Sequence, residues 1–561
     1  MLMAAIVDGG LYREPDFMMM RFFPAELIAD RNRFVITAGA VMVIVACVSM
    51  GCGLLSARFA AITSQGFAKN LRYGLLEQIQ HFSFANTDRF STPSLITRGT
   101  TDVNTVRMSM HLLLRTMTRS PIMLIMASVM SFVISPHLAL IFLIAIPVLF
   151  AIMFILIRVG MPRFRKMLVK TDAMNRTVQE NLVSARVVKA YVRGDYESRR
   201  FEDTAEDLRK ATLSSSRLFT LSGPIQMLIM WGCTIVLLLI GGQEIIFEKT
   251  GLLTGELVSM VSYATQAVNS LAMLSWLFMS LSRAHASLVR INEVLDEVPD
   301  IADGDSEAIV EDGSIDFENV CFSYSKDPAK LALKYIDFHI NSGETVGVIG
   351  GTGEGKSTLV SMIPRFYDTL SGTVRVGGRD VRDYRLKNLR DGVSMVLQNG
   401  TLFSGTIAEN LRWGKKDATL EEMEAACAVA CADEFISRSP KGYDTLLEQN
   451  AANLSGGQKQ RLRIARAVIK QPKILILDDS TSAVDMATDE HIRRALRSTL
   501  PGTTKIIIAQ RIASIISCDR IIVLDEGSLS DIGTHAELME RSQIYRDVYD
   551  SQMAQEVDTN G

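Results

Sequence analysis

The chain has 561 residues, and its 59 Lys and Arg nearly balance its 62 Asp and Glu, which leaves a formal net charge of −3. A balance this close argues against a dedicated nucleic-acid-binding protein, so no nucleic-acid partner is expected. The seven Cys include no C-x-x-C pair and give no sign of a disulfide framework. Hydrophobic residues make up 48% of the chain, and nearly all of the excess lies before about residue 290, which predicts a membrane-embedded first half.

Apolar stretches of roughly the length that crosses a bilayer, about 20 residues, occur in this first half. They cover residues 34–55, 120–134, 138–159, 219–240 and 257–281. The basic residues are concentrated between them, in segments 56–119 and 160–218. Because cytoplasmic segments of membrane proteins carry an excess of Lys and Arg, these two segments are expected to be cytoplasmic continuations of membrane helices. Residues 1–292 therefore form a predicted transmembrane domain.

The number of spans raises a question about the N-terminus, because five spans and a cytoplasmic C-terminal domain would place it outside the cell. The apolar run Met1–Val7 is too short to cross a membrane. We interpret it as the end of a truncated first helix, followed by an external loop from about Asp8 to Arg33. A genuine five-span subunit is the alternative.

The second half of the chain has a different pattern. An acidic stretch, Glu293 to Asp312, is interpreted as a solvated linker. Short β-rich runs then alternate with helical ones from 313 to 550, which predicts an α/β domain, and residues 551–561 remain as a C-terminal tail. The predicted fold is multidomain: an all-α transmembrane bundle with long cytoplasmic helical extensions, followed by the α/β domain.

A phosphate-binding loop follows the strand-like run 345–349 and has the pattern G-x-x-x-x-G-K-[ST]. Its residues are Gly350, Gly351, Thr352, Gly353, Glu354, Gly355, Lys356, Ser357 and Thr358. The glycines let backbone N–H groups approach phosphates, Lys356 reaches the β- and γ-phosphates, and Ser357 ligates Mg²⁺. The motif predicts that the domain binds ATP with Mg²⁺.

A pair of carboxylates, Asp478 and Asp479, follows the aliphatic strand Ile474–Leu477. At the carboxyl end of this strand, Asp478 is placed to hold Mg²⁺. Asp479 stands next to it, where a general base would face the attacking water.

The chain also carries a run that looks like the signature motif of ABC ATPases. The run consists of Leu454, Ser455, Gly456, Gly457 and Gln458. With the phosphate-binding loop and the Asp478 strand, it makes the chain similar to ABC exporter half-transporters over nearly its whole length. Segments Ser94–Arg98 and Arg186–Tyr191 match the two cytoplasmic extensions of that family's membrane domain. The resemblance implies that the α/β domain is a P-loop ABC ATPase domain.

The same resemblance implies roles for further positions. Tyr324 corresponds to the aromatic residue that stacks on adenine. Gln398 corresponds to the glutamine that senses the γ-phosphate and joins the Mg²⁺ shell. The segment Ser482–Asp485, with Asp485 at the nucleotide, resembles the loop that crosses the dimer interface.

Three positions depart from the family pattern. Asp479 stands where the family has a catalytic glutamate, and its carboxylate is one methylene shorter. Gln510 replaces a histidine after the strand 506–509 and cannot change charge near neutral pH. Glu354 replaces a small residue in the phosphate-binding loop, and we expect its side chain to point to solvent or across the dimer interface.

These departures weaken the chain's own ATP site and leave its signature motif intact. The pattern resembles the degenerate half of a heterodimeric bacterial multidrug exporter, which implies a second half-transporter as the partner. The expected function is ATP-driven efflux of an amphipathic or hydrophobic small molecule, drug or lipid across the cell membrane, with membrane lipid as a further partner. The ATPase domain is expected in the cytoplasm. A slow homodimeric exporter and a non-hydrolysing regulatory ATP-binding subunit are the alternatives.

Overall fold

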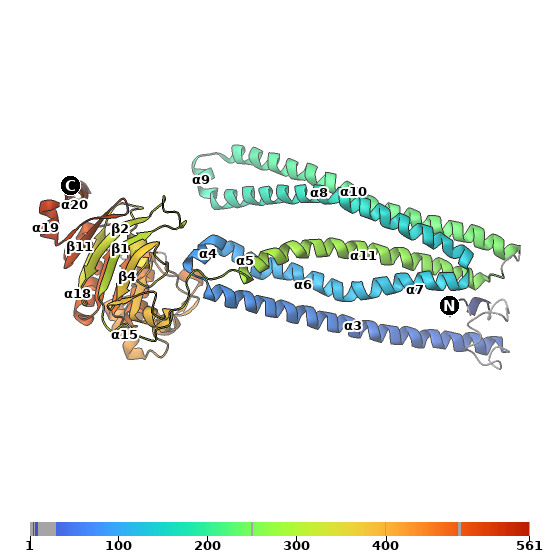
Figure 1. Ribbon diagram of the computed structural model, residues 1–561, viewed down its shortest axis with the longest axis horizontal. Coiled ribbons are helices and arrows are strands. Elements are labelled where there is room, and N and C mark those ends of the chain that lie inside the picture. Colours follow the sequence, from blue (N-terminus) through green and yellow to red (C-terminus); the bar gives the residue numbers. More distant parts are fainter. Residues whose placement is uncertain are drawn as a thin grey trace. The chain divides into compact units, whose positions relative to one another are not determined.

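A computed structural model describes residues 4, 6–8, 30–247, 251–398, 400–480 and 484–559. The chain divides into two compact units (Figure 1). The helical unit comprises Met1–Ile79 and Pro93–Glu297, and the ATPase unit comprises Gln80–Thr92 and Val298–Gly561. The predicted truncated helix at Met1–Val7 and the external loop after it lie largely outside the described residues.

Within the described residues, the helical unit contains five helices that are long and apolar enough to cross a membrane. These candidate spans are Asn32–His81, Thr92–Ile134, Pro136–Val183, Gly194–Ile246 and Thr254–Leu295. Each has at least 42 residues, about twice the length that crosses a bilayer. Every span therefore continues well beyond the membrane, and the predicted class, a helical membrane domain with long helical extensions, is confirmed.

The sequence explains where one of the long helices of this unit begins. The first long helix is α3 (Arg31–His81). The second span is assembled from α5 (Thr92–Thr97), η3 (Arg98–Asp102), α6 (Val103–Leu112), η4 (Leu113–Met117) and α7 (Thr118–Ile134). Ser135 then separates α7 from α8 (Pro136–Val183), because its hydroxyl accepts a hydrogen bond from Leu138 N–H at 3.4 Å and Pro136 occupies the first helical position.

The remaining long helices complete the bundle. α8 and α10 (Gly194–Ile246) run side by side and are joined by the short helix α9 (Ala185–Ala190), whereas α11 (Thr254–Leu295) lies along α6 and α7 (Figure 1). Leu138, Phe142, Leu237 and Met260 form part of a buried apolar cluster between these helices.

The ATPase unit is built on a six-stranded sheet with the order β12-β11-β3-β10-β9-β6. Its strands are β3 (Thr345–Ile349), β6 (Val393–Val396), β9 (Ile474–Asp478), β10 (Thr504–Ile508), β11 (Arg520–Asp525) and β12 (Ser528–Gly533). All neighbours are parallel except β11 and β12. Because parallel strands end at the same edge, the sheet brings the residues after β3, β9 and β10 together.

A second sheet lies beside the first, with four strands in the order β2-β1-β4-β5, and β7 pairs with β8 in a small ribbon. These strands are β1 (Ile315–Phe322), β2 (Leu333–Ile340), β4 (Ser371–Val376), β5 (Arg379–Asp380), β7 (Gly405–Thr406) and β8 (Leu446–Leu447). The α-helices that the second half of the chain contributes are α12 (Lys356–Ser361), α13 (Leu386–Gly392), α14 (Ile407–Arg412), α15 (Leu420–Val429), α16 (Asp433–Arg438), α17 (Gly456–Val468), α18 (Met486–Thr499), α19 (His535–Arg541) and α20 (Gln543–Thr559). Two large apolar clusters of buried side chains hold them against the sheets.

The predicted solvated linker and the predicted C-terminal tail both have defined places. From the acidic stretch 293–312, Gly304 N–H donates to the Tyr384 carbonyl at 3.2 Å, and the side chains of Ile301 and Val310 are buried. The C-terminal stretch continues α20 to Thr559.

A short helix from the first half of the chain, α4 (Phe84–Phe90), belongs to the ATPase unit. The ring of Phe84 stacks on that of Phe366, with centroids 4.3 Å apart. The hydroxyl of Tyr367 donates to the Asp88 carboxylate at 2.8 Å. These contacts tie the segment between two membrane helices to the ATPase.

Candidate nucleotide-binding site

The phosphate-binding loop connects β3 to α12. Gly353 and Gly355 have φ angles of +90° and +89°, which side chains with a Cβ rarely adopt. Lys356 Nζ donates to the carbonyls of Gly350 and Gly351 at 2.8 and 2.5 Å, so the ammonium group lies across the mouth of the loop. Burial lowers the pKa of Lys356, partly offset by the charges of nearby carboxylates. The loop is thus arranged to surround phosphate with N–H donors and one cation.

Glu354 does not take the direction expected from the sequence. Its carboxylate turns back onto the phosphate-binding loop and accepts a hydrogen bond from Gly351 N–H. A Cβ placed on Gly351 would lie 2.5 Å from Glu354 Oε1, and one on Gly350 would lie 2.5 Å from Oε2. The expectation that this side chain points to solvent is therefore wrong, whereas a direction across a dimer interface stays a prediction. The unpaired backbone donor of a glycine-rich turn attracts the carboxylate more strongly than water does.

Two of the three residues predicted to hold Mg²⁺ lie in contact: Ser357, in the first turn of α12, and Asp478, at the end of β9. Ser357 Oγ donates to Asp478 Oδ1 at 3.0 Å. Asp478 is 5% exposed, and burial raises its pKa against the opposing effect of this hydrogen bond. A hydroxyl and a carboxylate oxygen are the ligand types that Mg²⁺ takes beside nucleotide phosphates. Gln398, the third predicted ligand, instead donates to Asp479 Oδ2 at 3.1 Å.

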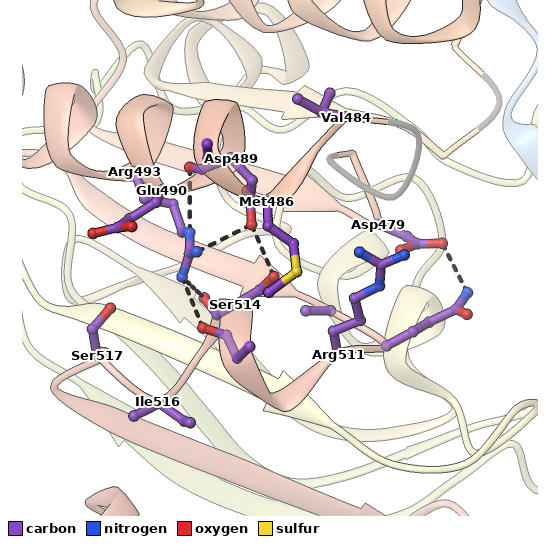
Figure 2. Close-up of a pocket in the computed structure, with 14 residues that line it drawn as sticks. Asp479, Val484, Met486, Asp489, Glu490, Arg493, Arg511, Ser514, Ile516 and Ser517 are labelled. Atoms are coloured by element: carbon purple, nitrogen blue, oxygen red, sulfur yellow. Dashed lines mark hydrogen bonds and ion pairs between the residues drawn. The ribbon is translucent and has the colours of Figure 1, made fainter. Parts of the chain in front are cut away.

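Asp479 lies directly after β9 with a φ of +46°, an uncommon backbone conformation for a residue with a side chain. Its Oδ2 atom also accepts a hydrogen bond from Gln510 Nε2 at 2.8 Å, drawn as a dashed line from Asp479 in Figure 2. Burial raises the pKa of Asp479, and the hydrogen bonds from Gln398 and Gln510 oppose that rise. The side chains from β6, β9 and β10 thus meet on one oxygen atom.

Beside this contact lies a pocket of about 560 Å³, shown in Figure 2. It is lined by Asp479 and Gln510, by the first turns of α18, and by the loop after Gln510. Within it, Asp489 accepts from Ser514 Oγ at 2.9 Å and pairs with Arg493 at 3.1 Å. This pair fixes α18 to the loop that follows β10.

The predicted adenine contact, Tyr324, is anchored at its hydroxyl and open at its ring. The hydroxyl lies 2.8 Å from Thr358 Oγ1, and the residue is 56% exposed. Tyr367 meets the ring edge to face, with centroids 5.3 Å apart. The ring therefore stands at a fixed distance from the phosphate-binding loop, with area available for a base.

The signature motif begins α17. Ser455 is the N-cap: its Oγ accepts from Gln458 N–H at 3.3 Å, while Gln458 Oε1 accepts from Ser455 N–H at 2.9 Å. This reciprocal capping box fixes Gly456 and Gly457 as the first turn of the helix. Leu454, the residue before the N-cap, packs against the apolar core. The Ser455 hydroxyl and the first N–H groups are thus presented at the surface of the unit.

Asp485 caps another helix. Its carboxylate accepts from Thr488 N–H at 2.9 Å and from Thr488 Oγ1 at 2.8 Å, which starts α18 and lowers its pKa. Ser482 and Ala483, from the predicted interface loop, lie outside the described residues.

Two residues at the site carried no signal in the sequence. Tyr367 follows α12 without a motif of its own, although an aromatic residue near a phosphate-binding helix is a usable hint. Gln552 lies far along the chain, yet it bonds to the backbone on both sides of Arg511. A lone glutamine on a C-terminal helix is not distinguishable by pattern.

Comparison with known proteins agrees with this geometry. Residues 17–271 match the family model of the ABC transporter transmembrane region, and residues 333–482 match that of the ABC transporter ATPase domain, described as "ABC transporter". The chain is 37% identical over 556 residues to the ABC transporter ATP-binding protein YfiB of Bacillus subtilis, covering 99% of this chain and 93% of YfiB. The chain belongs to the ABC transporter family.

Other ABC transporters are similar over almost as much of the sequence. Rv1273c of Mycobacterium tuberculosis is 33% identical over 555 residues, covering 98% of this chain and 92% of the relative. A solved bacterial Atm1-family ABC exporter with ATP bound has a TM-score of 0.79 at 24% identity, covering 95% of this chain and 93% of that one. This ABC transporter is thus a multi-pass half-transporter with a membrane domain and an ATPase domain on one chain. Such half-transporters dimerise and couple ATP hydrolysis to export.

Proposed function

We propose that this chain is the weakly hydrolysing half of a heterodimeric exporter. It binds ATP at its own phosphate-binding loop, and its Leu454–Gln458 motif completes the faster site of a partner half-transporter. The observation that carries the proposal is the hydrogen bond between Gln510 and Asp479. Both residues stand where the family has catalytic residues, and here their side chains bind each other. The capping box of Ser455, by contrast, has no such change.

Mg²⁺ in this proposal is held by Ser357 and Asp478, with Gln398 joining when ATP draws it away from Asp479. The hydrogen bond between Ser357 and Asp478 supports the first part, since it brings the two ligand oxygen atoms to within 3.0 Å of each other. The metal supplies charge neutralisation for the β- and γ-phosphates. The adenine stacks on Tyr324, and residues 350–358 enclose the phosphates.

The transported substrate is proposed to be an amphipathic or hydrophobic small molecule, drug or lipid. Many apolar side chains of the five spans are exposed on the single chain, for example Phe132, Leu143 and Trp276. Such surfaces suit lipid on one side and an apolar ligand between two halves on the other. We further propose a bacterial plasma membrane as the location, a cytoplasmic ATPase domain, and domains at 1–292, 313–550 and a joining segment 293–312.

A slow homodimer is the second candidate, and one observation favours it. Burial raises the pKa of Asp479, which makes its carboxylate a stronger base than an exposed aspartate. A homodimer with two equal sites would then hydrolyse ATP slowly at both.

Comparison of two variants in the purified full-length complex separates the candidates. Ser455→Arg places a bulky cation at the N-cap of α17, and we expect it to abolish most ATPase activity. Asp479→Asn removes a base that is already misplaced, and we expect a much smaller loss. Ser498→Arg, at an exposed serine near the end of α18, controls for the added charge. Equal damage from Ser455→Arg and Asp479→Asn would favour the homodimer.

A further inference from the structure

The last helix of the chain holds the loop that carries Gln510. Gln552, on α20, uses both functions of its side-chain amide: Oε1 accepts from Ile512 N–H at 2.8 Å, and Nε2 donates to the Gln510 carbonyl at 2.7 Å. One side chain thus bonds to the backbone on either side of Arg511. An amide pinned at both its donor and its acceptor has little freedom left.

We call these two hydrogen bonds from Gln552 to the loop backbone the grip. The anchorage of α20 to the ATPase core holds Gln552 in position to make them. Tyr545 is fully buried, and its hydroxyl lies 2.8 Å from His535 Nδ1. Tyr545 precedes Gln552 by seven residues, which is about two helical turns. The helix is therefore fixed to the ATPase core shortly before the residue that reaches the loop.

The loop is held from a second helix at its other end. Arg493 of α18 donates to the carbonyls of Ala513 and Ser514 at 3.1 and 2.7 Å (Figure 2). These bonds fix the end of η7 (Ile512–Ser514). Gln552 bonds directly to the backbone of Gln510, next to the side chain that donates to Asp479.

We propose that Gln552 is a positioning residue for Gln510. It fixes the Gln510 backbone so that the side chain bonds Asp479 before ATP binds and reaches the γ-phosphate afterwards. The inference rests on the proposed function, which gives Gln510 its place at the γ-phosphate. Through this grip, any displacement of α20 changes how long the chain's own site retains ATP.

The test measures release of radiolabelled ATP from the purified full-length dimer. Gln510→Ala removes the phosphate contact, and Gln552→Ala removes only the grip. We expect each variant to release ATP about three- to tenfold faster, the range for one or two lost hydrogen bonds. The double variant should release ATP no faster than Gln510→Ala, because Gln552 acts through Gln510.

The control is Gln543→Ala, which removes another glutamine of α20 that bonds to Asp547 at 2.7 Å on the same helix. Release should be unchanged in this variant. Unchanged release in Gln552→Ala, or multiplied effects in the double variant, would overturn the proposal. Multiplied effects would assign Gln552 a general structural role instead.

Hydrogen exchange at the Ile512 amide distinguishes the two levels of the argument. Loss of the grip should accelerate exchange in Gln552→Ala but not in Gln510→Ala or Gln543→Ala. If exchange accelerates while Gln510→Ala releases ATP at the wild-type rate, the proposed role of Gln510 fails and the grip stands. If exchange is unchanged in Gln552→Ala, the grip itself is refuted.

Discussion

Gln510 Nε2 donates a hydrogen bond to Asp479 Oδ2 over 2.8 Å, so two departures from the family pattern contact each other. The shorter carboxylate of Asp479 stays close to the sheet edge, and the uncharged amide stabilises it there. A glutamate would extend farther toward the attacking water, and a histidine would exchange a proton near neutral pH. Under the proposed function, this pair would slow hydrolysis at the site without removing the residues that bind ATP.

Restoring the family residues should raise hydrolysis at this chain's own site. We expect Asp479→Glu together with Gln510→His to increase its rate by up to about 10²-fold, the cost of a misplacement of about 1 Å. The rate is measured in a Ser455→Arg background, where the partner's site is disabled. Asp479→Glu alone should give a smaller gain, because Gln510 continues to bind the carboxylate. No gain in the double variant would mean that another feature limits the rate.

Removing the charge of Glu354 should tighten ATP binding. Its carboxylate accepts a hydrogen bond from Gly351 N–H and lies close to the phosphate site. A negative charge there repels the phosphates, so Glu354→Gln should lower the Kd for ATP by roughly three- to tenfold. Equilibrium titration of the full-length chain measures this Kd. Glu421→Gln, at an exposed residue of α15, is the control, and Lys356→Ala should shift the Kd in the opposite direction. A weaker affinity in Glu354→Gln would show that the carboxylate serves mainly to shape the loop.

The direction of Glu354 illustrates what the sequence leaves open. The phosphate-binding loop, the Asp478 strand and the signature motif are contiguous runs, and their local pattern is sufficient to predict the ATPase fold. The side-chain direction of Glu354 depends on an N–H group of Gly351 that becomes available only in the folded turn. A charge in a solvated loop would have pointed outward, which is why the expectation was wrong.

Contacts between segments far apart in the sequence could likewise not be predicted. The long spans were predictable because hydropathy is a property of one segment at a time. The grip of Gln552 on Gln510 joins residues 42 positions apart, and Tyr367 reaches Asp88 across 279. Neither pair has a periodic or compositional signal, so only the tertiary fold shows them.

The pH dependence of hydrolysis should report on Asp479. A general base must be ionised, so the rate at this site should fall as the pH drops through the pKa of Asp479. Burial raises that pKa above the ordinary 3.8. The acid limb of the pH–rate profile, where the rate falls with falling pH, should therefore lie at a higher pH than for an exposed aspartate. Gln510→Ala removes a hydrogen bond that favours the ionised form, and the limb should move to still higher pH. Rates in the Ser455→Arg background provide the measurement, and a shift to lower pH would contradict this assignment.

The last prediction concerns a polar cluster in the helical unit. Asp102, in the π-helical turn η3, is 2% exposed and accepts hydrogen bonds at 2.9 Å from Ser287 Oγ and from Arg290 Nε, both on α11. Arg98, at the start of the same turn, pairs with Glu293 at 2.9 Å. A π-helical turn changes the direction of the side chains around it, and here it aims both residues at α11.

Asp102→Asn should destabilise the packing of α11 against the second span. The variant removes the carboxylate charge that pairs with Arg290 and leaves Ser287 with a weaker acceptor, at a cost of about 1–3 kcal/mol. Asp207→Asn is the matched control, because Asp207 pairs with Lys170 at 2.5 Å and both side chains are well exposed. An exposed pair contributes only about 0–1 kcal/mol. Thermal unfolding of the purified full-length chain should therefore begin at a lower temperature in Asp102→Asn than in Asp207→Asn. Equal unfolding temperatures would show that the cluster around Asp102 contributes no more than a surface pair.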